Sequence, residues 1–253
     1  MNNAKRVEIA VPVYNEEKEL KKNIDILHAF CKDNLKKYQW HITVVDNASI
    51  DNTPLIGAAL AKEYPEISLL RLEEKGRGRA VKKAWVESGA DLCAYMDLDL
   101  STDLVHLPKL LRALESGYDI AIGSRLAKGA RVEGRTILRE ITSRTLNFIF
   151  IQSVFFTHFT DAQCGFKAVT KKVVEELIPK IEDNEWFFDG ELLIVGEKSG
   201  YKIYEEPVHW VDNLGSTVRL ISTISGDVRV MCRLFFNRPW NKIRREKKQY
   251  GRD

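Results

Sequence analysis

The chain has 253 residues and a mass of 29.0 kDa, which is enough for one large domain with a sizeable core. Hydrophobic residues make up 44% and charged residues 30%, and this balance excludes a disordered or collagen-like chain. The net charge of +3 is too small to indicate a nucleic-acid-binding protein by itself.

The first strand-like segment spans residues 7–13, and no signal peptide precedes it, so we expect a cytoplasmic protein. The four cysteines lie far apart and form no Cys-x-x-Cys pair, which argues against zinc binding and dithiol redox chemistry. The longest apolar stretch, residues 146–159, is interrupted by polar residues and is too short to span a bilayer.

Strand-like and helix-like segments alternate along the first half of the chain. Apolar runs predict strands at residues 7–13, 41–46, 67–72, 92–96 and 119–123, and helical periodicity predicts helices at 16–38, 53–64, 75–88 and after residue 99. This alternation predicts right-handed βαβ units and an α/β fold with a mostly parallel central sheet flanked by helices. The later pattern predicts a strand at 162–169, a helix at 186–200, a strand at 201–210 and an amphipathic helix at 218–236. We expect one domain over residues 1–217, followed by a C-terminal amphipathic helix and basic tail over residues 218–253.

Acidic residues follow the predicted strands at their carboxyl ends, where ligands bind in such sheets. Asp97 and Asp99 are separated by one residue after the fourth strand, so both carboxylates can face one site. Carboxylate oxygens suit Mg²⁺ or Mn²⁺, and such a cation can bridge the diphosphate of a nucleotide substrate. The alternative is a solvated turn that caps the next helix. Asp46 and the turn from Tyr14 to Glu16 also lie at strand ends.

Three further motifs precede the Asp97-Leu98-Asp99 sequence. They are Val11-Pro12-Val13-Tyr14-Asn15-Glu16-Glu17, Val44-Val45-Asp46-Asn47-Ala48-Ser49-Ile50-Asp51 and Lys75-Gly76-x-Gly78-x-Ala80. In this order the motifs resemble those of the family-2 glycosyltransferases, over about the first 125 residues. The resemblance implies a GT-A fold, which is Rossmann-like, and a nucleotide-sugar donor.

The second half of the chain is similar to one branch of that family, which acts on polyprenyl phosphates. The motifs are Gly123-Ser124-Arg125, the spaced Arg131, Arg139 and Ser143, and Asp161-x-Gln163-Cys164-Gly165-Phe166-Lys167. This branch includes the dolichyl-phosphate mannose and glucose synthases. Phe188-Asp189-Gly190-Glu191-Leu192-Leu193 and Trp210…Gly215-Ser216 resemble the glucosyltransferases more closely. Ser101 stands where mannose synthases often carry Gln, which disfavours a mannose donor.

The resemblance assigns roles to individual residues. It implies that the nucleotide pocket is lined by Pro12, Tyr14, Glu16 and Lys75, and that Asp46 binds the base or ribose. Asp97 would approach the ribose or metal, and Asp99 would ligate the metal. The acceptor phosphate would be held by Arg125, Arg139 and Ser143. Guanidinium groups bind phosphate oxygens in bidentate fashion, which supports the last assignment independently. A solvated basic helix face is the alternative for residues 125–144. Asp161 or Asp189 would orient the acceptor or steady positive charge on the sugar, and a helix N-cap is the alternative for Asp189.

We therefore expect a metal-dependent enzyme that transfers a hexose, with inversion, from a nucleotide-sugar to dolichyl or undecaprenyl phosphate. UDP-glucose is the favoured donor and GDP-mannose the next, and the cofactor is Mg²⁺ or Mn²⁺. One alternative is a hydroxyl acceptor in polysaccharide or glycolipid synthesis, with Asp189 as the base. Another is a catalytically silent module that binds nucleotide-sugars.

A polyprenyl acceptor lies in a bilayer, so we expect peripheral attachment to the cytoplasmic face of a membrane. The aromatic run of Phe148, Phe150, Phe155, Phe156 and Phe159 and the basic tail at residues 238–252 are the expected contacts, with Trp240 directed toward lipid. Core packing is the alternative for the aromatic run. Nucleic acid is a weaker partner because no stacking motif accompanies the charge. His106 is expected to be exposed, and the oligomeric state stays open.

Overall fold

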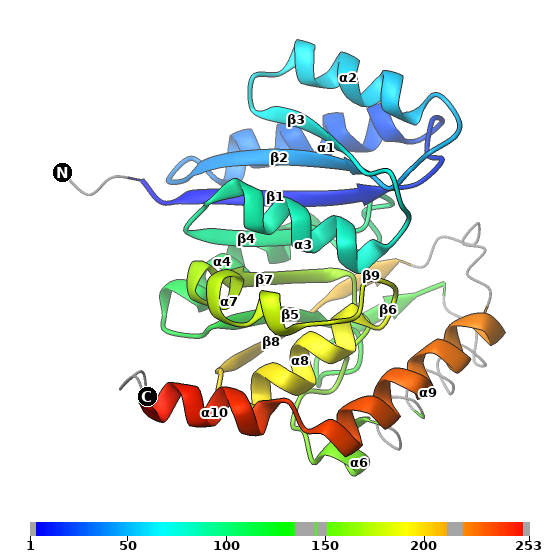
Figure 1. Cartoon of the computed structure of the whole chain (residues 1–253). Helices are drawn as coiled ribbons and strands as arrows, with labels where there is room; N and C mark the ends of the chain where they lie inside the picture. Colours follow the sequence, from blue (N-terminus) through cyan, green and yellow to red (C-terminus); the bar gives the residue numbers. More distant parts are fainter. Residues whose placement is uncertain (1–3, 135–144, 146–150, 212–219, 250–253) are drawn as a thin grey trace.

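The computed structural model describes residues 4–134, 145, 151–211 and 220–249. Its centre is a seven-stranded sheet in the order β3-β2-β1-β4-β7-β5-β8 (Figure 1). The strands are β1 Arg6–Val13, β2 Gln39–Asp46, β3 Ile67–Arg71, β4 Leu92–Met96, β5 Ile120–Ser124, β7 Phe166–Thr170 and β8 Ile203–Pro207. The expected α/β fold with a mostly parallel sheet is confirmed.

The strands β1 to β4 pair in parallel with one another, whereas β7 runs antiparallel between β4 and β5. The strand β8 pairs parallel with β5 at the edge of the sheet. The strand predicted at 162–169 starts only at Phe166, because the preceding residues turn past the end of β4, where the Asp97 N–H donates to the Gly165 carbonyl. A small second sheet pairs β6 Arg131–Glu133 with β9 His209–Val211.

Helices cover both faces of the central sheet (Figure 1). They are α1 Leu20–Asn34, α2 Thr53–Glu63, α3 Arg77–Ser88, α4 Leu107–Glu115, α6 Ser153–Phe155, α7 Lys171–Glu176, α8 Phe188–Lys198, α9 Leu220–Asn237 and α10 Trp240–Gln249, with short 3₁₀ turns η1 Leu104–His106 and η3 Ile178–Lys180. The helix predicted at 16–38 is therefore shorter at both ends. Alternate residues of β1 enter different hydrophobic clusters, Ile9 on one face and Ala10 on the other. Such two-sided burial explains the almost continuous apolar strands.

The C-terminal helices pack against the body of the protein. Trp240 is only 9% exposed, and its ring meets the Phe155 ring at a centroid distance of 6.2 Å. Trp240 and Ile243 both belong to the cluster that contains α8. The expectation that Trp240 faces lipid is therefore wrong, because its apolar ring fills a gap between helices. Of the helices in the described part of the chain, none has the length and apolar character needed to cross a bilayer.

The aromatic run at residues 148–159 divides between core and surface. Phe155 and Phe159 are buried, which corrects the expectation that they contact a membrane, whereas Phe156 is 77% exposed. Phe148 and Phe150 lie outside the described residues. His106, which was expected to be exposed, is buried and bonded to Glu206, with 2.9 Å between His106 Nδ1 and Glu206 Oε1.

Candidate active site

The loops that follow β1, β2 and β4 meet at one end of the sheet, because these three strands are neighbours and parallel (Figure 1). Each loop contains a non-glycine residue in the left-handed region, namely Asn15 with φ 54°, Ala48 with φ 61° and Leu100 with φ 50°. This conformation is costly for such residues and persists where the surroundings enforce it, which often marks a functional site.

Hydrogen bonds tie the first two loops together. The Asn15 N–H donates to Ser49 Oγ over 2.9 Å, and Asn15 Oδ1 accepts from the Ile50 N–H over 2.9 Å. The Glu16 N–H donates to Thr53 Oγ1 over 2.7 Å. Thr53 is therefore not the N-cap that its position before Pro54 suggests. Asn52 precedes the helix, and Thr53 instead fixes the loop that carries Glu16.

Tyr14, Lys75 and Asp46 surround the same strand ends. The Lys75 ammonium lies 3.8 Å from the centre of the Tyr14 ring, in cation–π geometry. Asp46 is fully buried, and its Oδ1 accepts from the Ser49 N–H over 3.0 Å. Its Oδ2 makes no hydrogen bond, and Arg71 Nε lies 3.4 Å away. Pro12, the other expected member, lies within β1 opposite Val45.

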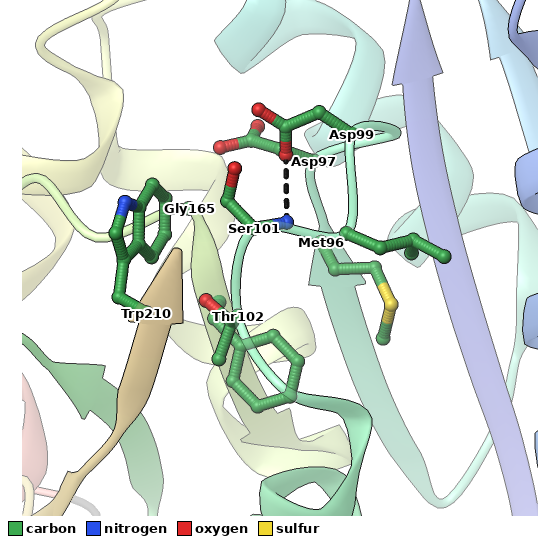
Figure 2. Close-up of a pocket in the computed structure, with 9 residues that line it drawn as sticks. Met96, Asp97, Asp99, Ser101, Thr102, Gly165 and Trp210 are labelled. Carbon is green, nitrogen blue, oxygen red and sulfur yellow. Dashed lines mark hydrogen bonds between the residues drawn. The ribbon is translucent and has the colours of Figure 1, made fainter. Parts of the chain in front are cut away.

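Asp97 and Asp99 lie at the carboxyl end of β4, beside a small pocket. Figure 2 shows the two carboxylates close together above Ser101, with Trp210 at one side of the pocket. Asp99 Oδ1 accepts from the Ser101 N–H over 3.0 Å. The hydroxyl groups of Ser101 and Thr102 are buried, and neither has a hydrogen-bond partner.

Negative charge is concentrated at this point. Burial raises the pKa of Asp99, and the nearby Asp97 carboxylate adds to the effect. The pKa of Glu16 is raised by burial and then by Asp99 and Asp51. A bound cation would relieve this repulsion.

The residues present fit a Mg²⁺ or Mn²⁺ ion that is shared with a substrate. Mg²⁺ is usually bound by one or two carboxylates together with substrate phosphates, and Asp97 and Asp99 supply two carboxylates. Across the ranges that the structure describes, no group of three or more His, Cys, Asp or Glu residues could hold a metal ion. The substrate and water would therefore have to complete the coordination.

Arg77 joins two acidic residues from distant parts of the chain. Its Nη2 lies 2.5 Å from Asp97 Oδ1, and its Nη1 lies 2.7 Å from Asp189 Oδ2. Burial alone would lower the pKa of Arg77, but Asp97 and Asp189 together raise it well above its usual value. Asp189 is the second residue of α8 and is buried, so the alternative that it caps this helix is wrong.

Asp189 has two further partners. The Tyr95 hydroxyl donates to Asp189 Oδ1, and the ammonium group of Lys167, which is fully buried in β7, lies 3.1 Å from the same oxygen. Arg77, Tyr95 and Lys167 were missed in the sequence. A lysine within an apolar central strand requires a buried partner, so the sequence alone could have indicated that Lys167 pairs with a buried acidic residue.

Arg125 and Asp161 form a second buried pair at the ends of β5 and the turn before β7. Arg125 Nε donates to Asp161 Oδ2 over 2.7 Å, and Nη2 donates to Oδ1 over 2.9 Å. Burial opposes ionisation of Asp161, yet Arg125 holds its pKa at about 2. The Arg125 guanidinium lies 5.0 Å from the centre of the Trp210 ring.

Trp210 connects this pair with the acidic loop, since it also lines the pocket beside Asp99. Its strand β9 is fixed to that loop, where the Val211 N–H donates to the Ser101 carbonyl over 2.9 Å and the Asp103 N–H donates to the His209 carbonyl over 3.0 Å. Arg139, Ser143, Gly215 and Ser216 lie outside the described residues. The structure therefore brings both the acidic pair and Arg125 close to Trp210.

Comparison with known proteins identifies the family of the chain. The sequence model "Glycosyl transferase family 2" matches residues 8–178. Glycosyltransferase AglD of Haloferax volcanii is 32% identical over 87% of the chain, which spans 35% of that relative's length. The dolichyl-phosphate beta-glucosyltransferase of Dictyostelium discoideum is 30% identical over 82% of the chain and 67% of its own length. A dolichol-phosphate mannosyltransferase of Pyrococcus furiosus is 33% identical over 67% of the chain and 47% of its own length.

A solved structure shares the fold. Glucosyl-3-phosphoglycerate synthase from Mycobacterium tuberculosis, in complex with Mn²⁺ and UDP-glucose, superposes with a TM-score of 0.64 at 15% identity, over 90% of this chain and 79% of its own. The match confirms a GT-A fold. Because the family model covers most of the chain and the relatives match it over the same region, the chain belongs to glycosyltransferase family 2.

Proposed function

We propose that this glycosyltransferase transfers a hexose from a nucleotide-sugar to a polyprenyl phosphate, dolichyl or undecaprenyl, with inversion at the anomeric carbon. The observation that carries the proposal is the set of hydrogen bonds to Asp161 and Asp189, the two carboxylates that could act as a base. Asp161 accepts two hydrogen bonds from the Arg125 guanidinium, and Asp189 accepts from Arg77 and Tyr95. A carboxylate whose oxygens already accept hydrogen bonds from guanidinium and hydroxyl groups is poorly placed to accept a proton from a substrate. An acceptor phosphate needs no such base because it is already ionised at neutral pH.

A hydroxyl acceptor fits this arrangement less well. Its proton must be removed as the sugar is transferred, which requires a base with an available oxygen and a suitable pKa. Asp189, the candidate for that role, faces Arg77 and Lys167. The charge arrangement therefore favours the phosphate acceptor.

On the donor side, Pro12, Tyr14, Glu16 and Lys75 line the nucleotide site, and Asp46 binds the base or ribose. Asp99, with Asp97 beside it, holds Mg²⁺ or Mn²⁺, which would offset the charge of the departing diphosphate. Asp46 Oδ2 faces Arg71 but accepts no hydrogen bond, which supports its role, since a buried carboxylate oxygen gains from a hydroxyl or N–H donor.

On the acceptor side, Arg125 holds the phosphate together with Arg139 and Ser143. Asp161 engages Nε and Nη2 of Arg125 and so fixes the orientation of the guanidinium. The phosphate oxygen attacks the anomeric carbon on the face opposite the nucleotide, which gives a β-linked product. Asp161 and Asp189 also place negative charge near the sugar, where positive charge develops.

The donor is UDP-glucose in preference to GDP-mannose. Ser101 and the Phe188-Asp189-Gly190-Glu191-Leu192-Leu193 motif support glucose, as does the similarity to the Dictyostelium glucosyltransferase. Glucose and mannose differ only in the orientation of the 2-hydroxyl group. A site that hydrogen-bonds this hydroxyl rejects the epimer, because a buried partner is otherwise left unsatisfied.

Peripheral contact with the cytoplasmic face of a membrane completes the proposal. Phe156 and Phe236 are 77% and 78% exposed, and Arg238 follows close behind Phe236. The short helix α6 lies beside the junction of α9 and α10, where Phe155 meets Trp240 (Figure 1). Exposed aromatic rings next to basic side chains are typical of interfacial contacts.

A transfer assay tests the function directly. UDP-glucose and GDP-mannose are each offered with polyprenyl phosphate and with the matching polyprenol, which lacks the phosphate, in the presence of Mn²⁺. We expect transfer from UDP-glucose to the phosphate only. Transfer to the polyprenol would contradict the acceptor, and faster use of GDP-mannose would contradict the donor. Binding of UDP without any turnover would indicate a silent module instead.

A further inference from the structure

Several contacts hold Arg77 in place in addition to its two ion pairs. Its guanidinium lies between two aromatic rings, with its Cζ 5.2 Å from the centre of Tyr95 and 5.3 Å from the centre of Trp186. Its side chain is 11% exposed. The backbone before it is fixed as well, since the Gly76 N–H donates to Asn47 Oδ1 over 2.8 Å. These contacts fix the position of Arg77 independently of its two carboxylate partners.

The two carboxylates bound to Arg77 differ in their surroundings. The Asp189 side chain is 2% exposed and also contacts Lys167, whereas the Asp97 side chain is 34% exposed. Loss of Asp189 would leave a buried charge without its partner, which is costly. If Asp97 turns away, Arg77 keeps its ion pair with Asp189, a carboxylate that it shares with Lys167. Asp97 is thus the partner that can leave.

Each carboxylate oxygen of Asp97 has a close contact in the structure. Its Oδ1 contacts Arg77, and its Oδ2 lies against Gly165, where an added Cβ would overlap the carboxylate. Only glycine allows this close approach. Because Arg77 already pairs with one oxygen of Asp97, a cation bound beside Asp99 would share the charge of this carboxylate with Arg77.

We propose that Arg77 is the resident counter-ion of Asp97, and that a divalent cation and Arg77 compete for this carboxylate. When a cation binds at Asp97 and Asp99, the Arg77–Asp97 contact breaks and Arg77 stays on Asp189. The ion pair thus offsets part of the negative charge of the acidic loop before the donor arrives. This inference rests on the proposed metal role, but not on the identity of the sugar or of the acceptor.

The test is a Mn²⁺ titration without nucleotide or acceptor, followed by the electron paramagnetic resonance signal of free Mn²⁺. Arg77→Met removes the competitor, and Arg77→Lys keeps one charge that cannot contact both carboxylates. Arg79→Met is the matched control, because Arg79 lies in the same helical turn and pairs with Glu74. Charge-assisted hydrogen bonds contribute about 1.5–3 kcal/mol, so we expect Arg77→Met to bind Mn²⁺ roughly tenfold or more tightly. Arg77→Lys should lie between Arg77→Met and the wild type, and Arg79→Met should match the wild type.

Unchanged or weaker Mn²⁺ binding in both Arg77 variants would overturn the competition. Circular dichroism checks the folding of each variant. If Arg77→Met does not fold, Arg77→Lys decides alone, and an affinity equal to that of the wild type refutes the inference. Absence of Mn²⁺ binding in the wild type and in every variant, also when UDP is added to complete the coordination, would remove the metal role and the competition together. A failed transfer to polyprenyl phosphate, with tighter Mn²⁺ binding in Arg77→Met, would refute the proposed acceptor and leave the competition standing.

Discussion

The buried pair of Arg125 and Asp161 allows a quantitative test of how the acceptor side is built. Asp161 is fully buried and accepts the Arg125 backbone N–H over 3.1 Å in addition to both guanidinium bonds. Breaking one partner of a buried ion pair costs about 3–5 kcal/mol, because the other charge is left uncompensated. Asp161→Asn should therefore lower the free energy of unfolding by that amount. For a domain of this size, the melting temperature should fall by roughly 6–20 °C.

A double-mutant cycle with Arg125→Met isolates the interaction between the two side chains. Urea denaturation of both single variants and the double variant should give a coupling energy of about 2 kcal/mol or more. The surface pair of Arg131 and Glu133, with 2.9 Å between Nε and Oε1, is the matched control. Its coupling should stay below about 1 kcal/mol, since both side chains are exposed. If the buried pair couples no more strongly than the surface pair, Asp161 does not fix Arg125.

Three further perturbations test other parts of the site. Asp99→Ala should reduce transfer by roughly a hundredfold or more, because a charge next to the diphosphate is lost, and wild-type activity that resists chelation would contradict this. Gly165→Ala should displace the Asp97 carboxylate and abolish transfer, while circular dichroism shows that the protein still folds. Gly226→Ala is the control and should leave transfer unchanged, because a Cβ added there meets nothing within 4 Å. Phe236→Ala should weaken flotation with anionic liposomes at low salt, and unaltered flotation would exclude this side chain from the membrane contact.

The sequence predicted the parts of the site that are local in the chain. Asp97 and Asp99 are close in sequence and follow a recognisable strand, so the chain itself brings them together. The mostly parallel character of the sheet was also predicted, since alternation of strands and helices restricts the topology, whereas the antiparallel β7 between β4 and β5 was not. The loops after β1 and β2 carry motifs whose residues contact one another across 34 or 35 positions.

The contacts of Arg77 were not predictable in the same way. Its two partners lie 20 and 112 residues away, one in the loop that follows β4 and the other in α8. No periodicity in the sequence links these positions, and the motif left the position of Arg77 unspecified. Trp240 shows a related failure. Seven Lys or Arg residues between 237 and 253 suggested a solvated or lipid-bound tail, but the apolar face of α10, with Trp240 and Ile243, packs into the core.

Glu8 provides a test of the sheet itself, far from the acidic loop. It lies within β1, is 4% exposed, and its Oε1 has no hydrogen-bond partner. Burial raises the pKa of Glu8 from 4.5 to about 7, and contacts with Thr43 offset only part of this effect. The folded protein therefore retains a proton that the unfolded chain releases above pH 4.5. The stabilisation is complete below pH 4.5 and is lost as the pH rises to about 7.

Glu8→Gln stays neutral at every pH and should not suffer this loss. The two pKa values correspond to a difference on the order of 3 kcal/mol in the free energy of unfolding, in favour of the variant at pH 8. Near pH 4.5 the variant and the wild type should differ little. Urea denaturation at several pH values between 4.5 and 8 measures this difference, with Glu19→Gln as the exposed control. A difference that does not grow with pH, or a variant less stable than the wild type at pH 8, would show that the Glu8 carboxyl is already ionised in the folded sheet.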